Sequence, residues 1–559
     1  MLTIALCQTD SNVGAIDHNT QTLLQKRQEA AKKNAHLLVT SELFLSGYPP
    51  EDLLLHPPFL SAIQQAVTHI AAETKKEGPA ILLGTPWQHN DHCINAALLL
   101  QHGRIQHIIA KSTLPNYGVF DEKRVFHPAP HPSAPIPFHN HRCTILICED
   151  LWHATDRPTP SPIDSDNTDL IIVLNASPFE PNKLQQRQRI AQTLATHLNA
   201  PLFYVNTVGG QDELLFDGGS FIIDSRGHLT ASAPQWQEAH LVASYNKETN
   251  TLTSDPSPAR HSPPTPMDSL ACDYHGLLCG IASYCRQSGL PHVLLGLSGG
   301  IDSALVATLA VDSLGASCVH AIMMPSPYTS ELSRRDAHAL AHALGLQLEE
   351  VAIDDWLATF DTQLRAAQGN KQLARQNIQA RLRGLWLMAQ ANLHNRLLLA
   401  TGNKSEYAMG YATLYGDMCG GLAPLKDVYK TRVYALARWR QQHKPHPSAP
   451  DQPFTESLLT KAPSAELAPN QKDSDDMPDY AILDPLLYQL LEGNAEPAAL
   501  TSPHLTSSEI IAIWQRVINA EYKRRQAPPG LKLSSCLFGR DRRYPLLNHY
   551  QRAPTPSPS

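Results

Sequence analysis

Cys148 ends the apolar run in TILICEDLW and is followed directly by Glu149 and Asp150. A short run of β-branched and apolar residues is typical of a buried strand, and the residue that ends it emerges at a sheet edge, where loops build sites. A thiol in that position can attack an amide carbon once a neighbouring base has removed its proton. The pattern therefore predicts a nucleophilic cysteine, although a free cysteine taken alone is more often an inert part of a core.

Two further residues could complete such a site. Glu42 ends the strand pattern HLLVTSE, and its carboxylate could serve as the base. Lys111, in AKSTLPNYGVFDEKR, could place a cation where negative charge develops on the attacked oxygen. Either residue alone would more often be solvated surface, so the prediction depends on all three occurring together.

A second kind of chemistry is indicated by SGGIDS, residues 298–303, where two glycines stand between an apolar run and a helical pattern. Backbone NH groups and the positive end of the helix can then face phosphate oxygens, and Ser298 and Ser303 add hydroxyl groups. No lysine follows the glycines, so this is not the GxxxxGK[ST] pattern of γ-phosphate transfer. The loop favours binding of the pyrophosphate end of a nucleotide, although such turns also serve packing in many α/β folds.

Short apolar strands alternate with longer helical patterns in both halves of the chain, which predicts an α/β protein. Helical spacing fills residues 19–34, and the helix after the glycine loop is expected to end at Gly315. The predicted strands are LTIALCQ, HLLVTSE, AILLGTP, CTILICED and DLIIVLNAS in the first half, and the start of HVLLGLSGG, then VHAIMMP and RLLLATG, in the second.

The length of 559 residues with 42% hydrophobic residues is enough for about two or three cores. The segment TSDPSPARHSPPTPMD is dense in proline and is expected to be a linker, and residues 443–480 are expected to form a surface excursion that carries short motifs. The expected organisation is a first domain at 1–250, a linker at 251–268, a second domain at 269–550 and a disordered tail at 551–559.

Composition excludes several classes of protein. The net charge of −7 gives no basic field, so nucleic acid is not an expected partner. We expect no secretory leader and no membrane association, because no stretch approaches roughly 18 apolar residues. The ten scattered cysteines form no CxxC pair, which favours a reducing, cytoplasmic location without structural zinc. His338 and His342 share a helical face but lack an evident third metal ligand.

The contexts of Glu42, Lys111 and Cys148 together resemble the Glu–Lys–Cys triad of the nitrilase family, in the version fused to glutamine-dependent NAD synthetases. The resemblance implies a nitrilase-like α-β-β-α sandwich in which Glu42 is the general base, Lys111 stabilises the oxyanion and Cys148 is the nucleophile. It also implies that Glu122 steadies the lysine. The positions that would hold glutamine are Tyr117, Glu149, Ser177 and Lys183, of which Tyr117 and Ser177 could instead serve loop packing.

The 298–303 loop resembles that of the N-type ATP pyrophosphatases, and several later segments resemble the NAD synthetase domain. These segments are MPSPYTSELSRRDAHALAHALG, QNIQARLRG, TGNKSEYAMGYATLYGDMCGGLAPLKDVYKTRV, KAPSAELAPNQKDSDDMPDY and FGRDRRYP. The resemblance implies a Rossmann-like parallel-sheet ATP pyrophosphatase domain after the sandwich, and it covers nearly the whole chain.

The resemblance also assigns residues of this second domain. The positions that would hold ATP are Ser298, Gly299, Gly300, Asp302, Ser303, Thr401 and Lys430, with Ser464 as a further contact. Asp302 and Glu406 would hold Mg²⁺, since carboxylate oxygens suit a hard cation. Asn377 and Arg381 lie four apart on one helical face and would meet one ligand. The positions that would hold deamido-NAD are Asn377, Arg381, Glu406, Asp417 and Lys532.

Some positions depart from the family pattern or have plain alternatives. Gln376 stands where the family usually has glutamate, and residues 534–536 occupy a stretch that is more often basic, which leaves Lys532 to carry its contact alone. Glu406 or Asp417 could simply cap a helix. The cluster Arg540, Arg542 and Arg543 could clamp phosphates or pair with neighbouring acids.

Taken together, the resemblance implies a carbon–nitrogen ligase that hydrolyses glutamine and amidates deamido-NAD through an adenylate, converting ATP to AMP and pyrophosphate. It implies only small-molecule substrates and a homo-oligomer with an internal passage for ammonia. One alternative is an amidotransferase that acts on another carboxylate or carbonyl, against which Asn377 and Arg381 argue. Another is an amidase whose second half binds nucleotide only as a regulator, against which Asp302, Glu406 and Lys430 argue.

Overall fold

The computed structural model describes residues 1–89, 91–153, 167–254, 267–365, 368–469, 471–548 and 550. The chain divides into two compact units, Met1–Met267 and Asp268–Ser559. Most of the predicted linker at 251–268, and all of the predicted tail at 551–559, lie outside the described residues. No helix in the described ranges is long and apolar enough to span a membrane.

The first unit contains a seven-stranded and a six-stranded sheet, ordered β15-β14-β1-β2-β3-β4-β5 and β13-β12-β9-β8-β7-β6, and a separate β10-β11 ribbon. The strands are β1 (Leu2–Gln8), β2 (Leu37–Val39), β3 (Ala80–His89), β4 (His92–Gln101), β5 (Arg104–Ala110), β6 (Ile136–Phe138), β7 (His141–Ile147), β8 (Leu170–Asn175), β9 (Leu202–Asn206), β10 (Val208–Gln211), β11 (Leu214–Asp217), β12 (Phe221–Ile223), β13 (Leu229–Ser232), β14 (Ala239–Asn246) and β15 (Thr251–Ser254). The helices are α1 (Ile16–Lys32), η1 (Glu51–Leu55), α2 (Pro57–Glu73), η2 (Glu122–Arg124), α3 (Glu149–Trp152) and α4 (Lys183–His197).

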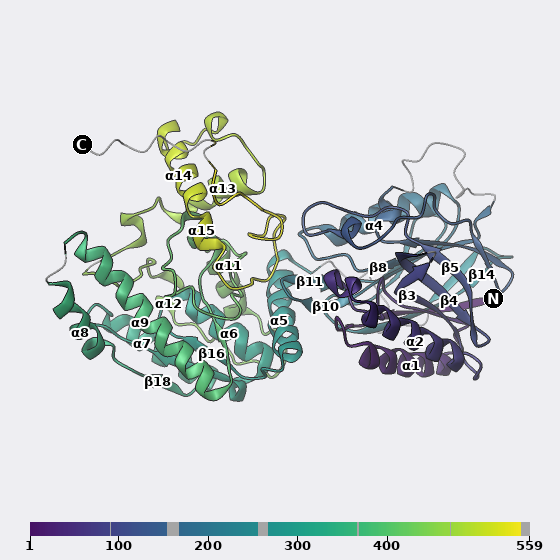
Figure 1. The fold of residues 1–559 in the computed structure, drawn as a ribbon, viewed down its shortest axis with the longest axis horizontal. Helices are drawn as coiled ribbons and strands as arrows, with labels where there is room; N and C mark the ends of the chain where they lie inside the picture. The colour runs from purple at the N-terminus through teal and green to yellow at the C-terminus, as the bar shows by residue number, and fades with distance from the viewer. Residues whose placement is uncertain are drawn as a thin grey trace. The chain divides into compact units, whose positions relative to one another are not determined.

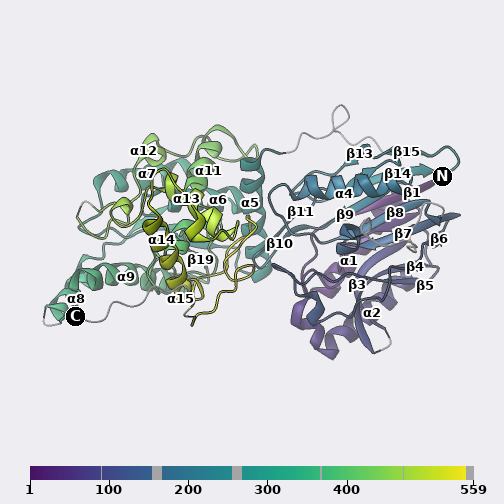
Figure 2. The same cartoon turned by 90° about the horizontal axis from the view of Figure 1, so that it is seen from above.

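Helices cover the outer faces of both sheets, which makes four layers (Figure 2). Along β1, Ile4 and Leu6 belong to a core that also holds Ile145 and Ile147 of the other sheet. Ala5 and Cys7 alternate with them and belong to the core beneath α1 and α2, while α4 covers the six-stranded sheet. A strand buried on both faces reads as a continuous apolar run, which explains the patterns in the sequence. The predicted α-β-β-α sandwich is confirmed.

The second unit is built on a four-stranded parallel sheet of order β18-β17-β16-β19. Its strands are β16 (Val293–Gly296), β17 (Val319–Met323), β18 (Leu348–Glu350) and β19 (Leu397–Leu399). Its helices, drawn in teal to yellow in Figure 1, are α5 (Ser269–Ser288), α6 (Ile301–Leu314), η4 (Ala316–Cys318), α7 (Glu331–Leu344), α8 (Asp354–Leu364), α9 (Lys371–His394), α10 (Lys404–Met409), α11 (Lys430–Gln442), α12 (Glu456–Thr460), η5 (Asp473–Asp475), α13 (Tyr480–Leu491), η6 (Pro497–Ala499), α14 (Ser507–Asn519) and α15 (Glu521–Arg524).

The predicted Rossmann-like parallel sheet is confirmed. The helix α6 ends at Leu314, and Gly315 follows as its C-cap with φ 82°, as the sequence predicts. The strand β16 lies between β17 and β19, so the strands that follow it in the chain lie on both of its sides, and the strand order reverses at β16. In open α/β sheets this point, at the carboxyl ends of the strands, is where ligands bind. The SGGIDS loop begins two residues after β16 and is therefore positioned there by the topology.

Candidate functional site

In the first unit, Lys111 is buried between two carboxylates. Its Nζ lies 2.7 Å from Glu42 Oε1 and 2.8 Å from Glu122 Oε2. Glu42 follows β2, Lys111 directly follows β5 and Cys148 directly follows β7. Ends of strands from both sheets therefore carry the three predicted residues, and the Cys148 thiol interacts electrostatically with both Glu42 and Lys111.

Cys148 lies on a sharp turn from β7 into α3, with φ 46° and ψ −100°. Its NH donates a hydrogen bond of 2.9 Å to the carbonyl of Leu174, the last apolar residue of neighbouring β8. A non-glycine residue rarely adopts such a backbone, and where one does, the surrounding structure must enforce it. The turn holds the thiol at the sheet edge, where it is only 3% exposed.

The electrostatics of this group favour a neutral thiol beside charged partners. Burial, followed by the charge of Glu42, raises the pKa of Cys148 well above its ordinary value. Burial alone would lower the pKa of Lys111, but the Glu122 and Glu42 carboxylates raise it well above its usual value, so Lys111 remains an ammonium. Burial also raises the pKa of Glu122 to about 7, against the attraction of Lys111. The thiol therefore needs a base before it can attack.

Glu42 is held as an acceptor by three NH donors. Besides Lys111, the Asn95 side chain donates to Oε1 at 2.8 Å and the backbone NH of Ala176 donates to Oε2 at 3.1 Å. Tyr48 donates from its hydroxyl to Glu122 at 3.0 Å. The sequence interpretation missed Asn95 and Tyr48. A polar residue inside the apolar strand β4 is the signal that could have identified Asn95.

The predicted glutamine-binding residues surround the same turn. The hydroxyl of Tyr117 donates to Glu149 at 3.1 Å. Lys183 begins α4, and its Nζ lies 4.7 Å from the ring centre of Trp152 at the end of α3. Ser177 is buried after β8, and its NH donates to Asn206 at 3.0 Å. A carboxylate, an ammonium and small polar groups therefore lie near α3, a set suited to the charged groups of an amino acid.

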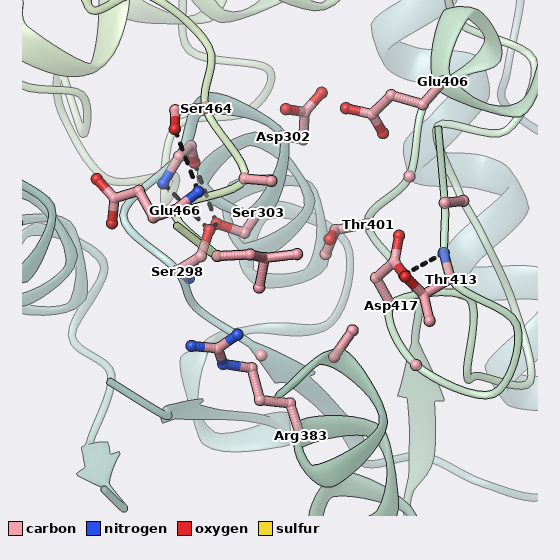
Figure 3. A pocket seen from close by; sticks show the side chains of 18 of the residues that line it. Ser298, Asp302, Ser303, Arg383, Thr401, Glu406, Thr413, Asp417, Ser464 and Glu466 are labelled. Carbon is pink, nitrogen blue, oxygen red and sulfur yellow. Dashed lines mark hydrogen bonds between the residues drawn. The ribbon is translucent and has the colours of Figure 1, made fainter. Parts of the chain in front are cut away.

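In the second unit, a cavity of about 520 Å³ lies at the carboxyl end of β16 (Figure 3). The predicted residues that line it are Ser298, Gly299, Gly300, Asp302, Ser303, Asn377, Thr401, Glu406, Asp417, Lys430 and Ser464. Gln376, the departure from the family pattern, also lines it. The 443–480 segment contributes part of the wall, so it is more than a surface excursion.

The SGGIDS loop forms a compact turn held by its own serines. The hydroxyls of Ser298 and Ser303 lie 3.0 Å apart, and the NH of Gly300 donates to Ser298 Oγ at 3.2 Å. Gly299 has φ 77°, and a Cβ there would lie 2.1 Å from the carbonyl oxygen of Ser333. Only glycine fits at this position, because the loop packs directly on the first turn of α7.

Asp302, Glu406 and Lys430 form a charged cluster on one side of this cavity. Lys430 bonds Asp302 and lies 3.5 Å from Glu406, while Asn403 donates to Asp302 at 2.9 Å. Burial, reinforced by the charge of Asp302, raises the pKa of Glu406 to about 8 against the attraction of Lys430. Glu406 also completes a capping box with Asn403 at the start of α10, so Glu406 does help to cap a helix, which was the alternative considered for it. The Asp302 and Glu406 carboxylates point toward one another in Figure 3.

Arg381 and Lys532 are not brought into this cavity. Arg381 is exposed on α9, and its Nε donates to the carbonyl of Leu414. Lys532 is buried, with its Nζ 2.8 Å from Asp541. Within the described residues, neither lines the cavity. Asn377 does, and it accepts a hydrogen bond of 3.0 Å from Thr413.

The other predicted clusters have structural partners. Arg542 is buried, with its guanidinium 4.0 Å from the ring centre of Tyr544 and 5.3 Å from that of Trp514. His338 lies 3.2 Å from Glu350, and no group of three or more metal-ligating side chains occurs in the part of the chain that the structure describes.

The sequence interpretation also missed several charged residues of the cavity wall, among them Arg383, Lys461 and Glu466. Arg383 donates from its Nε to the carbonyl of Met324 at 2.9 Å, and burial lowers its pKa to about 10. It lies across the cavity from Asp302 and Glu406 (Figure 3). Lys461 and Glu466 belong to the KAPSAE motif, so their place in a motif is the signal that could have identified them.

Comparisons with known proteins give the same division of the chain. Residues 3–253 match the Carbon-nitrogen hydrolase family and residues 274–527 match the NAD synthase family. The chain is 39% identical over 554 residues to the glutamine-dependent NAD(+) synthetase of Acinetobacter baylyi, with 98% of each chain covered. It is 39% identical over 564 residues to that of Synechocystis sp., again with 98% of each chain covered.

Among solved structures, the glutamine-dependent NAD+ synthetase of Acinetobacter baumannii in complex with adenosine diphosphate is similar over 98% of both chains, with a TM-score of 0.76 and 35% identity. The enzyme of Cytophaga hutchinsonii has a TM-score of 0.80 over 98% of both chains, and at 19% identity it supports the fold alone.

Proposed function

The chain belongs to the glutamine-dependent NAD(+) synthetases, and from this premise we propose the roles of its two sites in amidating deamido-NAD. It is a glutamine-hydrolysing carbon–nitrogen ligase. The proposal concerns the residues, the adenylate intermediate and the metal. The observation that carries it is the pairing of complementary sites in one chain: a buried thiol with a base and a cation, and a phosphate loop with a charged cavity.

The first site would release ammonia from glutamine. Glu42 takes the proton of the Cys148 thiol, and the thiolate attacks the side-chain amide carbon. The Lys111 ammonium stabilises the oxyanion of the tetrahedral intermediate. The proton held by Glu42 then passes to the leaving nitrogen as the C–N bond breaks, which frees ammonia and leaves a thioester. Water hydrolyses the thioester to glutamate and restores the thiol.

The second site would activate the acid that captures this ammonia. A free carboxylate is a poor electrophile, so the nicotinate carboxylate of deamido-NAD first attacks the α-phosphorus of ATP. Pyrophosphate leaves toward the 298–303 loop, whose NH groups and hydroxyls would donate hydrogen bonds to its negatively charged oxygens. Ammonia then adds to the carbonyl carbon of the adenylate, and AMP leaves as NAD forms.

The residues at the second site fit a hard cation. Asp302 and Glu406 present carboxylate oxygens to one cavity, where burial, with a smaller contribution from the charge of Asp302, raises the pKa of Glu406. Carboxylates in this arrangement suit Mg²⁺. When bound, Mg²⁺ would offset the negative charge of the ATP phosphates.

The test is a reaction with ATP, glutamine and deamido-NAD, followed by mass spectrometry. We expect NAD and AMP to appear in equal amounts. ADP in place of AMP would refute adenylation. Glutamate without AMP would support the alternative of an amidase with a regulatory nucleotide site, and AMP without NAD would support a different acceptor. The predicted homo-oligomer and cytoplasmic location stay predictions, and light scattering in solution tests the first.

Asn95 is expected to be a positioning residue of the first site. Its side chain donates to Glu42 Oε1, and its backbone carbonyl accepts from the NH of Lys111 at 2.8 Å. Replacement by alanine removes a hydrogen bond to a charged group, which is worth about 1.5–3 kcal/mol. We expect Asn95→Ala to lower kcat/KM for glutamine about tenfold or more, with the pH profile of that activity displaced.

Two comparisons separate this role from general damage. Synthesis from added ammonium chloride should be unchanged, since Asn95 belongs to the first unit. Asn95→Asp places a second carboxylate against Glu42 and should lower kcat/KM for glutamine more than Asn95→Ala does. If both variants use glutamine as well as the wild type does, Asn95 has no positioning role.

A further inference from the structure

The phosphate loop of the second unit has no lysine of its own. In SGGIDS the available donors are backbone NH groups and two hydroxyls, and the buried cation Lys430, which lines the same cavity, is already bonded to Asp302. The pyrophosphate part of ATP carries several negative charges, which neutral donors alone neutralise poorly. A further cation near the loop is therefore expected on physical grounds.

Lys461 lies in the required place. It follows α12, 162 residues after Gly299, and its Nζ donates to the Gly299 carbonyl at 3.3 Å. The same Nζ donates to Ser333 Oγ at 2.5 Å. The contact exists because Gly299 lacks a Cβ, so that the loop and the first turn of α7 share one surface. Lys461 lines the cavity, and its side chain is 22% exposed.

Glu466, five residues later, holds this arrangement together. Its carboxylate accepts hydrogen bonds from Ser330 Oγ at 2.8 Å and from Ser333 Oγ at 2.7 Å, at the start of α7. Its Oε1 lies 4.0 Å from Lys461 Nζ, which is an ion pair without a direct hydrogen bond. Lys461 is therefore oriented toward the loop by Ser333 and Glu466, but its charge is only partly neutralised.

We propose that Lys461 binds the pyrophosphate portion of ATP and supplies, from a separate segment, the cation that the loop lacks. This inference depends on the proposed use of ATP at this cavity. Glu466 and Ser333 position the lysine, and Lys461 contacts the β- and γ-phosphates. The α-phosphate, where the chemistry occurs, is left to the Asp302, Glu406 and Lys430 cluster.

The test is isothermal titration of the full-length protein with MgATP, pyrophosphate and AMP. Lys461→Met is expected to weaken binding of MgATP and pyrophosphate about tenfold, the usual loss for a charge-assisted contact, and to leave AMP binding within about twofold. Lys461→Arg keeps the positive charge and should retain most of the affinity. Lys444→Met is the matched control, because Lys444 pairs with Asp451 at 2.8 Å on the surface, and it should change nothing.

Each outcome decides the matter. Equal losses for AMP and MgATP, or a lower unfolding temperature for Lys461→Met together with full loss in Lys461→Arg, would show that Lys461 merely organises the pocket and would overturn the inference. Unchanged affinity for pyrophosphate would overturn it as well. Failure of the wild-type protein to bind MgATP would instead refute the proposed function, a result distinct from any effect of the variants.

Discussion

Cys148→Ala is expected to lower the rate of NAD synthesis from glutamine at least about 1000-fold, while synthesis from added ammonium chloride continues. A thioester requires a thiol, and Cys148 supplies one beside Glu42 and Lys111 in the described part of the chain. Among the described residues, the cavity that we propose for adenylation is lined by residues of the second unit, so we expect it to work without Cys148. Initial rates of NAD formation with each nitrogen source measure the separation.

Cys143→Ala is the matched control for this variant. Cys143 lies on the same strand, β7, and is 2% exposed, but it packs in the core, where its Sγ donates to the carbonyl of His141 at 4.0 Å. It should use glutamine at nearly the wild-type rate. Loss of NAD synthesis from both glutamine and ammonium chloride in a folded Cys148→Ala protein would contradict the proposed separation of the two sites.

Asp302→Ala is expected to remove NAD synthesis from both nitrogen sources by at least about 100-fold, while glutamine hydrolysis persists. Asp302 lies in the first turn of α6, where it accepts hydrogen bonds from Lys430 and Asn403. Its loss removes one of two carboxylates proposed for Mg²⁺ and leaves Lys430 free to turn toward Glu406. Glutamate release, measured beside NAD formation, distinguishes this variant from Cys148→Ala.

Asp355→Ala provides a control of the same type. Asp355 is also in the first turn of a helix, α8, and is exposed there. Both substitutions remove a favourable charge near a helix N-terminus, an effect of about 0.3–1 kcal/mol. Asp355→Ala should keep full activity, so a loss confined to Asp302→Ala reflects the cavity. Retained ammonia-dependent synthesis in Asp302→Ala would exclude a direct role of this carboxylate.

Much of the fold could be predicted from local pattern. The strand β1 was predicted with its observed bounds, LTIALCQ, because a strand covered on both faces carries a continuous apolar run. The helix after the phosphate loop ends before Gly315 because glycine adopts a positive φ, here 82°, at little cost. The helix predicted at 19–34 spans Ile16–Lys32, since helix ends depend on packing that the sequence does not state.

The candidate sites were predictable to a smaller extent. Glu42, Lys111 and Cys148 could be selected because their three local contexts together resemble the nitrilase triad, and Glu42 and Cys148 also end predicted strands. Glu122 was expected to steady Lys111, and its Oε2 lies 2.8 Å from the Lys111 ammonium. The contacts of Asn95 and Tyr48 could not be told, because they depend on how β4 and the loop after β2 pack around these residues. Arg381 and Lys532 were expected to share one ligand site, yet helix α9 points the first to solvent and Asp541 binds the second.

The sequence by itself determined the two chemistries, the α/β architecture and the loop at 298–303, since these follow from neighbouring residues and from motifs that stay together along the chain. Only the tertiary structure decided that Asn95 donates to Glu42 and that Lys461 meets Gly299 across 162 residues. Contacts of that kind depend on which strands pair and how the helices pack over them, and the energy of those choices is spread over the whole core.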